Sequence, residues 1–160
     1  MTFYRLISIN MPALQVLDIS DNLFNGSLPS GLCDKSTRIR DLRFAVNYFA
    51  GIIPPQFGNC DFLEYLSIDS NLLTGFMPDF FHHFPNLSYF SGHSNNLSGV
   101  IPPSLSKSPT ISSLNLRNNS LDGSIDFNCW RRVKLTSLDL GSNNFSGTLP
   151  ANLASCRKLL

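Results

Sequence analysis

The sequence predicts an α/β solenoid: an arc of stacked coils with a parallel β-sheet along its concave face and a convex side made mostly of loops and 3-10 turns. Leucine-type positions recur about every 24 residues through most of the 160-residue chain. Leu, Ser and Asn supply 62 residues, whereas Asp, Glu, Lys and Arg make up only 14% of the chain; ordinary domains have about 25%. The formal net charge of +1 argues against nucleic acid or an anionic membrane surface as the main partner.

The repeated unit reads Leu-x-x-Leu-x-Leu-x-x-Asn-x-Leu-x-Gly-x-Leu-Pro, with other apolar residues standing in for Leu. Six units, numbered here as coils 1 to 6, span residues 14–158 and begin at residues 14, 39, 63, 87, 111 and 135. Residues 1–13 match only the tail of a preceding coil, and residues 159–160 begin a seventh. A fixed period of this length is the signature of a leucine-rich repeat. Because no polar capping segment flanks the coils, we expect an interior piece of a longer solenoid.

Each position of the unit has a physical reason. The Leu-x-x-Leu-x-Leu segment points alternate side chains inward and so forms a short strand with one buried face. The Asn turns the chain inward, where its amide can bond backbone groups of neighbouring coils in a ladder. Gly and Pro shape the convex return, where an interior helix would be broken. Coil 4 departs from the pattern at Gly92, which replaces a core side chain and predicts a thin spot.

The residues between the Leu positions face solvent on the concave side and form three columns at strand spacing. We name each column after its member in coil 1. The columns are the Ser20 column (Ser20, Ala45, Asp69, His93, Arg117, Gly141), the Asp18 column (Asp18, Arg43, Ser67, Ser91, Asn115, Asp139) and the Val16 column (Val16, Asp41, Tyr65, Tyr89, Ser113, Ser137).

These columns form a mixed polar track that suits an extended peptide, because a peptide needs aromatic contacts and hydrogen-bond partners on a rigid scaffold. Arg117 is the strongest ligand-binding candidate, since a planar and always charged donor suits an anionic group. The weaker candidates are Asp69, His93, Asn115, Tyr65 and Tyr89. For any single weaker candidate, a hydrated surface residue without a ligand is the better interpretation.

Five Asn-x-Ser sequons mark candidate N-glycosylation sites. Asn86 is the best candidate, and the others are Asn25, Asn96, Asn144 and Asn118. Coils rich in Asn and Ser also create sequons by chance, which accounts well for Asn96 and Asn144. Asn118 adjoins a ladder position, where a tight placement would prevent modification. Low charge and sequons together favour the cell exterior for the parent protein.

Four cysteines form two pairs on adjacent coils, Cys33 with Cys60 and Cys129 with Cys156, each pair separated by 27 residues. Either pair could form a disulfide. The same positions also suit a small buried apolar side chain, and we expect buried free thiols. The chain has no C-x-x-C, so a zinc or redox motif of that type is excluded.

No catalytic, phosphate-binding or zinc-protease motif is present in the sequence, so we expect neither enzymatic activity nor a cofactor for this chain. His82 and His83 lie near Asp79, but adjacent side chains point in different directions, and a solvated surface is a better interpretation than a metal site. Trp130-Arg131-Arg132 is interpreted as a packed indole beside solvated charges. No apolar run approaches the roughly 18 residues of a membrane helix, and the first residues are a poor secretory signal.

The repeat motif, with its Leu-x-Gly-x-Ile-Pro segment, resembles the plant extracellular leucine-rich repeats of receptor kinases, receptor-like proteins and polygalacturonase inhibitors. More specific segments are Tyr89-Phe-Ser-Gly-His-Ser-Asn-Asn96, Ser108-Pro-Thr-Ile-Ser-Ser-Leu-Asn-Leu-Arg-Asn-Asn-Ser120, Asn128-Cys129, Leu135-Thr-Ser-Leu-Asp-Leu140 and Cys156-Arg-Lys-Leu159. In these segments, and across residues 14–160 as a whole, the chain looks most like the phytosulfokine receptors. Gly92 is similar to that family too.

The resemblance implies the ligand-recognition segment, on the extracellular side of the plasma membrane, of a receptor kinase for a tyrosine-sulfated peptide hormone. It implies that Arg117 contacts the peptide, that a co-receptor kinase is a further partner, and that a Ser/Thr kinase domain and a membrane helix lie outside this chain. Since the resemblance also places other contact positions beyond Leu160, we expect the chain alone to bind the hormone negligibly. The alternatives are a fragment of a defence-related receptor-like protein or polygalacturonase-inhibitor-like protein, and a truncated gene product without activity.

Overall fold

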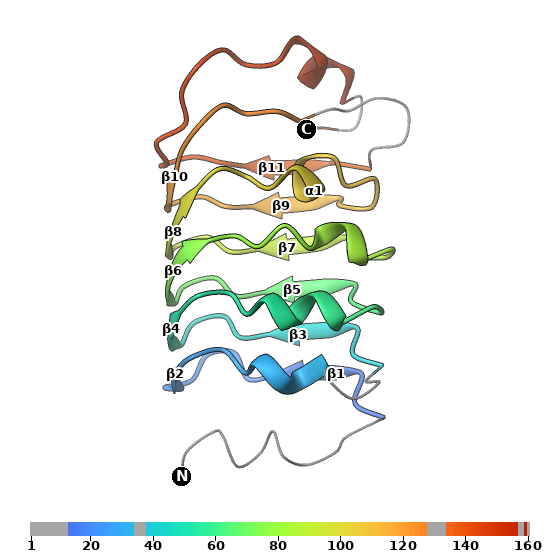
Figure 1. Cartoon of the computed structure of the whole chain (residues 1–160), viewed down its shortest axis with the longest axis vertical. Helices are drawn as coiled ribbons and strands as arrows, with labels where there is room; N and C mark the ends of the chain where they lie inside the picture. The colour runs from blue at the N-terminus through green and yellow to red at the C-terminus, as the bar shows by residue number, and fades with distance from the viewer. Residues whose placement is uncertain (1–12, 34–37, 128–133, 157–158, 160) are drawn as a thin grey trace.

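The computed structural model of the chain describes residues 13–33, 38–127, 134–156 and 159. The coils stack in single file, and each contributes one strand to a sheet that runs the length of the stack (Figure 1). The predicted solenoid with a parallel sheet is therefore confirmed. Residues 1–12, Cys129 and the Trp130-Arg131-Arg132 cluster lie outside the described residues.

The sheet formed by the Leu-x-x-Leu-x-Leu segments is called the inner sheet below. It has six parallel strands in chain order: β1 (Val16–Asp18), β3 (Asp41–Arg43), β5 (Tyr65–Ser67), β7 (Tyr89–Ser91), β9 (Ser113–Asn115) and β11 (Ser137–Asp139). Equivalent positions of successive coils pair directly, as in Leu42 with Leu66 and Leu66 with Phe90. The strands are short because only one Leu-x-Leu step per coil lies in the sheet before the turn.

A second sheet, also parallel, follows the turn in each of the first five coils. It contains β2 (Asn25–Gly26), β4 (Tyr48–Gly51), β6 (Leu72–Phe76), β8 (Asn96–Gly99) and β10 (Ser120–Leu121). An isolated bridge between Ser124 and Ser146 continues the same pattern toward coil 6. The repeat analysis did not predict this sheet, which lies along one side of the stack (Figure 1).

The convex returns are short helical turns, as predicted. They are the 3-10 turns η2 (Ser30–Cys33), η3 (Pro55–Asn59), η4 (Phe81–His83) and η5 (Ala151–Ser155), and the single-turn helix α1 (Pro103–Ser106). Pro at the start of η3 and α1 presets the backbone for a helical turn and lacks the N–H that such a start would leave unbonded. Among the described residues no helix is long and apolar enough to cross a membrane.

The predicted asparagine ladder is confirmed. Asn71, 7% exposed, donates from Nδ2 to the backbone carbonyls of Phe44, Ile68 and Asp69 at 2.9, 3.2 and 3.0 Å. Its Oδ1 accepts the backbone N–H of Phe49 at 2.9 Å. One side chain thus satisfies backbone groups of two coils. The same arrangement recurs at Asn47, Asn95, Asn119 and Asn143.

Each turn into the ladder uses a residue with a left-handed backbone directly before the Asn. These residues have φ between 52° and 56° and are Asp21, Val46, Ser70, Ser94, Asn118 and Ser142. Non-glycine residues rarely adopt this conformation, and Asn and Asp do so at the lowest cost. Val46 is therefore the least suitable residue of the six.

The predicted thin spot at Gly92 is wrong. In coil 4 the ring of Phe90 takes the place that Leu66 and Leu114 hold in the flanking coils. A Cβ placed on Gly92 would lie 3.4 Å from Cζ of Phe90 and 3.5 Å from Cδ2 of Leu116. Gly92 thus makes room for a larger neighbour, and the core stays filled.

The expectation of free thiols is also wrong. Cys33 and Cys60 form a disulfide between coils 1 and 2, with their Cα atoms 5.1 Å apart. Cys156 is disulfide-bonded as well. The reason is geometric, because adjacent coils lie one strand spacing apart and bring the two Cα atoms to a distance that a disulfide spans.

Candidate functional site

The three predicted columns lie side by side on the inner sheet. Strand register pairs each member of the Val16 column with the next, for example Tyr65 with Tyr89 and Tyr89 with Ser113. The Asp18 column follows the same register two residues later. The Ser20 column lies at the strand ends, where the N–H of Ser70 bonds the carbonyl of His93 and the N–H of Ser94 bonds that of Arg117. The columns are therefore confirmed as neighbours in space. The expectation that all their members face solvent is wrong for Ser67 and Ser91, which are 5% and 1% exposed.

Planar groups stack across coils 2, 3 and 4, one from the Asp18 column and two from the Val16 column. The rings of Tyr65 and Tyr89 are parallel within 1°, with centroids 4.1 Å apart. On the other face of Tyr65, the guanidinium Cζ of Arg43 lies 4.7 Å from the ring centroid. Asp41 fixes that guanidinium with two bonds, Nε to Oδ1 at 3.0 Å and Nη2 to Oδ2 at 2.7 Å. The order Arg43, Tyr65, Tyr89 is called the planar stack below.

The surroundings of Tyr65 and Arg43 raise the pKa of both side chains. Burial raises the pKa of Tyr65 to about 12, and the hydrogen bond with Tyr89 adds to that increase. The bond with Asp41 raises the pKa of Arg43 above its already high ordinary value. Tyr65 therefore stays a neutral phenol at any physiological pH, so its ring remains available for stacking.

Asp69 and His93 form a second contact between candidate residues, in the Ser20 column. His93 Nε2 lies 3.4 Å from Asp69 Oδ2, and the Ser67 hydroxyl donates to Asp69 Oδ1 at 2.6 Å. His93 Nδ1 lies 3.0 Å from the Ser94 hydroxyl. Their polar atoms are thus largely engaged with each other, which leaves less hydrogen-bonding capacity for a ligand than the sequence alone indicates.

Arg117 is the most exposed cation of the inner sheet, with 57% of its side chain accessible. Its Nη1 lies 3.8 Å from Oδ1 of Asp139, a long contact. The guanidinium rests over Gly141, since a Cβ placed there would lie 2.8 Å from Nη1. Asn115 positions the backbone rather than a ligand, because its Oδ1 accepts the N–H of Arg117 at 3.1 Å. The role of Gly141 could have been noticed in the sequence, where it follows five residues with side chains in the same column.

The structure therefore groups the candidates in three places: the planar stack with Tyr65 and Tyr89, the Asp69–His93 pair, and Arg117 over Gly141. Within the described residues no group of three or more His, Cys, Asp or Glu side chains could hold a metal ion. His82 and His83 are exposed, but their rings lie 4.2 Å apart, so the expectation that they point apart is wrong. Asp79 is bonded elsewhere, accepting the N–H of Ser104 at 2.9 Å, and that bonding to Ser104 lowers its pKa.

Comparison with protein families shows which family the chain belongs to. Leucine-rich repeat models match residues 13–34, 61–121 and 134–156. The chain belongs to the leucine-rich repeat family. Its six-coil stack and its second sheet are therefore features of a leucine-rich repeat solenoid.

Similar leucine-rich repeat proteins are plant receptors. Phytosulfokine receptor 1 of Arabidopsis thaliana is 40% identical over a match that covers 39% of this chain and 8% of that protein. The plant peptide hormone receptor RGFR1 in complex with RGF2 is 36% identical with a TM-score of 0.88, covering 92% of this chain and 24% of that one. The Arabidopsis receptor kinase HAESA, in complex with the peptide hormone IDA and the co-receptor SERK1, is 35% identical with a TM-score of 0.84 and the same coverage. This leucine-rich repeat chain thus spans less than a quarter of the length of these relatives.

The five sequon asparagines are all exposed: Asn25, Asn86, Asn96, Asn118 and Asn144. Asn86 lies in the loop after η4, whereas Asn96 lies in β8 and accepts a bond from the Ser120 hydroxyl at 2.9 Å. Asn118 has a left-handed backbone, and its Nδ2 lies 3.4 Å from the Ser94 hydroxyl. Asn86 and Asn144 both lie outside strands and helices, and the preference for Asn86 stays a prediction.

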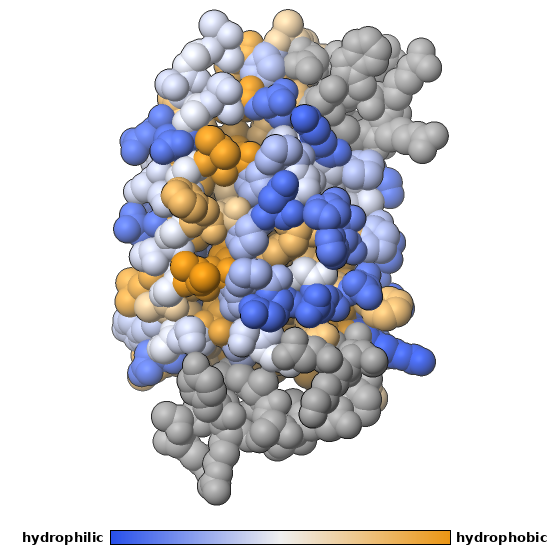
Figure 2. Space-filling view, in the orientation of Figure 1, coloured by the Kyte–Doolittle hydropathy of each residue, from blue (hydrophilic) through white to orange (hydrophobic). Residues whose placement is uncertain are grey.

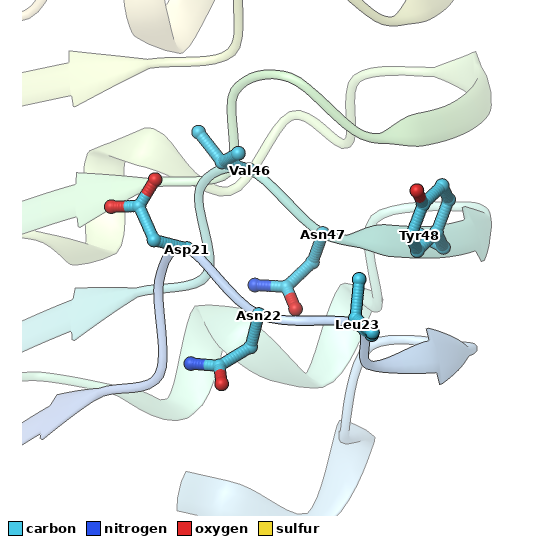
Figure 3. A pocket seen from close by; sticks show the side chains of 6 residues that line it. All are labelled: Asp21, Asn22, Leu23, Val46, Asn47 and Tyr48. Atoms are coloured by element: carbon cyan, nitrogen blue, oxygen red, sulfur yellow. The ribbon is translucent and has the colours of Figure 1, made fainter.

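Repeat analysis missed two surface features beside the inner sheet. A hollow of about 550 Å³ lies where coils 1 and 2 turn toward the second sheet, lined by Asp21, Asn22, Leu23, Val46, Asn47 and Tyr48 (Figure 3). Along the second sheet, Ile52, Phe76 and Val100 are exposed, and each approaches the glycine of the next coil. Apolar side chains accordingly gather on that side of the molecule (Figure 2). The apolar surface could have been predicted from the residue after each repeat glycine, which is apolar in coils 2, 3 and 4.

Proposed function

We propose that this chain is part of the ligand-recognition region of a plant cell-surface receptor kinase for a peptide hormone, and that its inner sheet binds the peptide. The observation that carries the proposal is Arg117. It offers a largely exposed guanidinium on the inner sheet, with one long contact to Asp139. A planar guanidinium can form two parallel bonds to a carboxylate, phosphate or sulfate.

The relatives support the peptide class of ligand. Two of them are described as receptors in complex with a peptide hormone, and the third is phytosulfokine receptor 1. Rigid parallel coils suit such a ligand because they present polar and aromatic groups at fixed spacing without ordering costs. The co-receptor SERK1 in the HAESA complex supports a co-receptor kinase as a further partner of the parent protein.

The finer proposal is that the anionic group is a sulfated tyrosine, as in phytosulfokine-type hormones. Similarity to phytosulfokine receptor 1 supports this specificity. Arg117 is its proposed contact, and Tyr65, Tyr89, Asp69, His93 and Asn115 are proposed as the surrounding surface. Given that several proposed contacts lie outside this chain, its own affinity for the peptide should be weak, in the millimolar range, about −4 kcal/mol.

The proposed site of action is the extracellular side of the plasma membrane. A disulfide between Cys33 and Cys60 and a further one at Cys156 support an oxidising compartment. We also propose N-glycosylation at the exposed sequons, Asn86 first. To test that site, the wild-type chain and Ser88→Ala, which removes the Asn86 sequon, can be expressed through a secretory pathway. Intact mass measurement of the two proteins then shows whether Asn86 carries a glycan.

The proposed function can be tested by titrating the oxidised chain with a sulfotyrosine peptide and, separately, with the same peptide without the sulfate. NMR chemical shifts of the chain report the binding. We expect the sulfated peptide to shift the Nε signal of Arg117 and the unsulfated peptide to do so several-fold less. Arg117→Ala should remove the difference between the peptides. Arg40→Ala is the matched control, because Arg40 is similarly exposed (54%) but is paired with Glu64 at 2.8 Å outside the three columns.

The possible outcomes test sulfate recognition, peptide binding and the rival function separately. Equal shifts with both peptides would reject sulfate recognition and keep peptide binding. No shift on the inner sheet with either peptide would reject peptide binding by this chain. Inhibition of a polygalacturonase by the chain would favour the rival function, a defence-related inhibitor.

A further inference from the structure

The planar stack is periodic with the solenoid. It contains one planar group for each of three successive coils: Arg43, then Tyr65 at 4.7 Å, then Tyr89 at 4.1 Å from Tyr65. These separations match the spacing of about 4.8 Å between neighbouring strands. Arg43 lies within the roughly 6 Å at which a guanidinium is attracted to an aromatic face, and the parallel rings of Tyr65 and Tyr89 are in face-to-face contact. A further planar group would therefore continue the stack without any movement of the backbone.

The stack stops at coil 5. There Ser113 pairs in register with Tyr89, and in coil 6 Ser137 pairs with Ser113. Tyr65 covers one face of the Tyr89 ring, and the opposite face looks toward Ser113. A serine side chain is too short to cover an aromatic ring. Among the described residues no other ring contacts Tyr89, and its side chain is partly exposed.

We propose that the uncovered face of Tyr89 is a subsite for an uncharged aromatic side chain of the bound peptide. The ligand ring would lie above Ser113, as the fourth member of the planar stack. This inference rests on the proposed function in taking the ligand to be a peptide, and it adds a second recognition element to Arg117.

The surroundings of the subsite select a neutral ring over a guanidinium. Its neighbours in the Val16 column, Ser113 and Ser137, carry no charge. The nearest carboxylate, Asp139, pairs in register with Asn115 and already lies 3.8 Å from Nη1 of Arg117. At the other end of the stack the cation Arg43 has its own carboxylate, Asp41. A cationic ligand group above Ser113 would have to share Asp139 with Arg117.

The subsite lies at a defined distance from Arg117. Positions 113 and 117 are four residues apart along coil 5, a separation of about 13 Å for extended backbone. An extended peptide spans that distance in about four residues. The preferred ligand should therefore carry its aromatic ring and its anionic group about four residues apart.

The test uses N-acetyltryptophanamide, a neutral aromatic probe, with the oxidised chain and NMR detection of the Tyr89 ring protons. Stacking should move these protons upfield and saturate at millimolar probe. Ser113→Tyr should abolish the shift, because the new ring would occupy the subsite itself. Ser137→Tyr should tighten probe binding roughly two- to tenfold, because its ring lies one coil farther and would sandwich the probe.

Comparison of the two substitutions distinguishes binding at the subsite from nonspecific binding of the probe. Both add a tyrosine to the same column, and circular dichroism verifies that both variants keep the fold. Equal probe shifts in the wild-type chain and Ser113→Tyr would overturn the proposal, as would the absence of any shift at Tyr89. Because the probe carries no charge, the result does not depend on Arg117, and a failure of sulfated-peptide binding would leave it standing.

Discussion

The asparagine ladder and the inner-sheet columns are built from the same six coils, yet they follow opposite rules. Every ladder position is the same residue, and in coils 2 to 6 each makes the same four-part set of bonds. In each column the residue changes from coil to coil, as in Asp69, His93 and Arg117. The ladder contacts backbone that is repeated in every coil, whereas most column residues are partly exposed and contact one another.

This difference shows how a repeat can carry specific recognition. Inward positions are constrained because the partner is always the backbone of the next coil. Outward positions have no such partner, so their identities can vary without loss of the fold. Substitutions inside the ladder should therefore act on stability, and those in the columns should act on binding. The predictions below test that separation.

The largest effect should come from the covalent link on the inward side of coils 1 and 2. The double variant Cys33→Ala with Cys60→Ala removes a disulfide that joins residues 27 apart. We expect the free energy of unfolding to fall by about 3.5 kcal/mol, as for a loop of this length. Urea denaturation measures it, and a loss below about 1 kcal/mol would show that the ladder alone holds these coils together.

Removal of one ladder side chain should have the next largest effect. Asn71→Ala deletes three donated bonds and one accepted bond at a buried position. We expect a loss of about 2–3 kcal/mol, because buried backbone groups would lack partners. Asn22→Ala is the matched control, since Asn22 is exposed and donates only to carbonyls of its own coil, Ile19 and Ser20. Equal losses in the two variants would contradict the role given to the cross-coil bonds.

The turn into the ladder offers a smaller and opposite effect. Val46 is β-branched, exposed and held at φ 54°, whereas Asn118 holds the same place in coil 5 at φ 56°. Val46→Asn should raise the free energy of unfolding by about 1 kcal/mol, because Asn tolerates the left-handed region better. The reciprocal change Asn118→Val should lower it by a similar amount. A destabilising Val46→Asn would mean that apolar contacts at the hollow outweigh backbone strain.

The smallest effect at neutral pH concerns the inner sheet. Tyr65 has a pKa of about 12 in the folded chain and an ordinary value of 10.0. Its contribution to stability is therefore complete below pH 10 and is lost as the pH rises toward 12, since the unfolded chain releases the proton first. Tyr65→Phe should remove this part of the alkaline decrease in stability. Unfolding curves across that range test it, and identical alkaline slopes for the two proteins would contradict it.

Sequence reasoning predicted the coils, the ladder and the columns because each follows from a residue's position within its own repeat. It failed where two coils had to be considered together. Gly92 looked like a defect until the ring of Phe90 was seen to fill the space. Cys33 and Cys60 looked like separate buried thiols although their coils bring them into bonding distance. The second sheet was missed because its strands have no alternating apolar pattern of their own.

The amino-acid sequence by itself determined which residues point inward and which form each column, because the 24-residue period repeats one backbone path and alternation within a strand assigns the faces. Only the tertiary structure decided what those side chains do to one another. It stacked Tyr65 on Tyr89, paired Asp69 with His93, and laid Arg117 over Gly141. The physical reason is distance: the partners are a full repeat apart in the chain but one strand spacing apart in space, and their contacts depend on rotamers and on the size of the neighbour in the next coil.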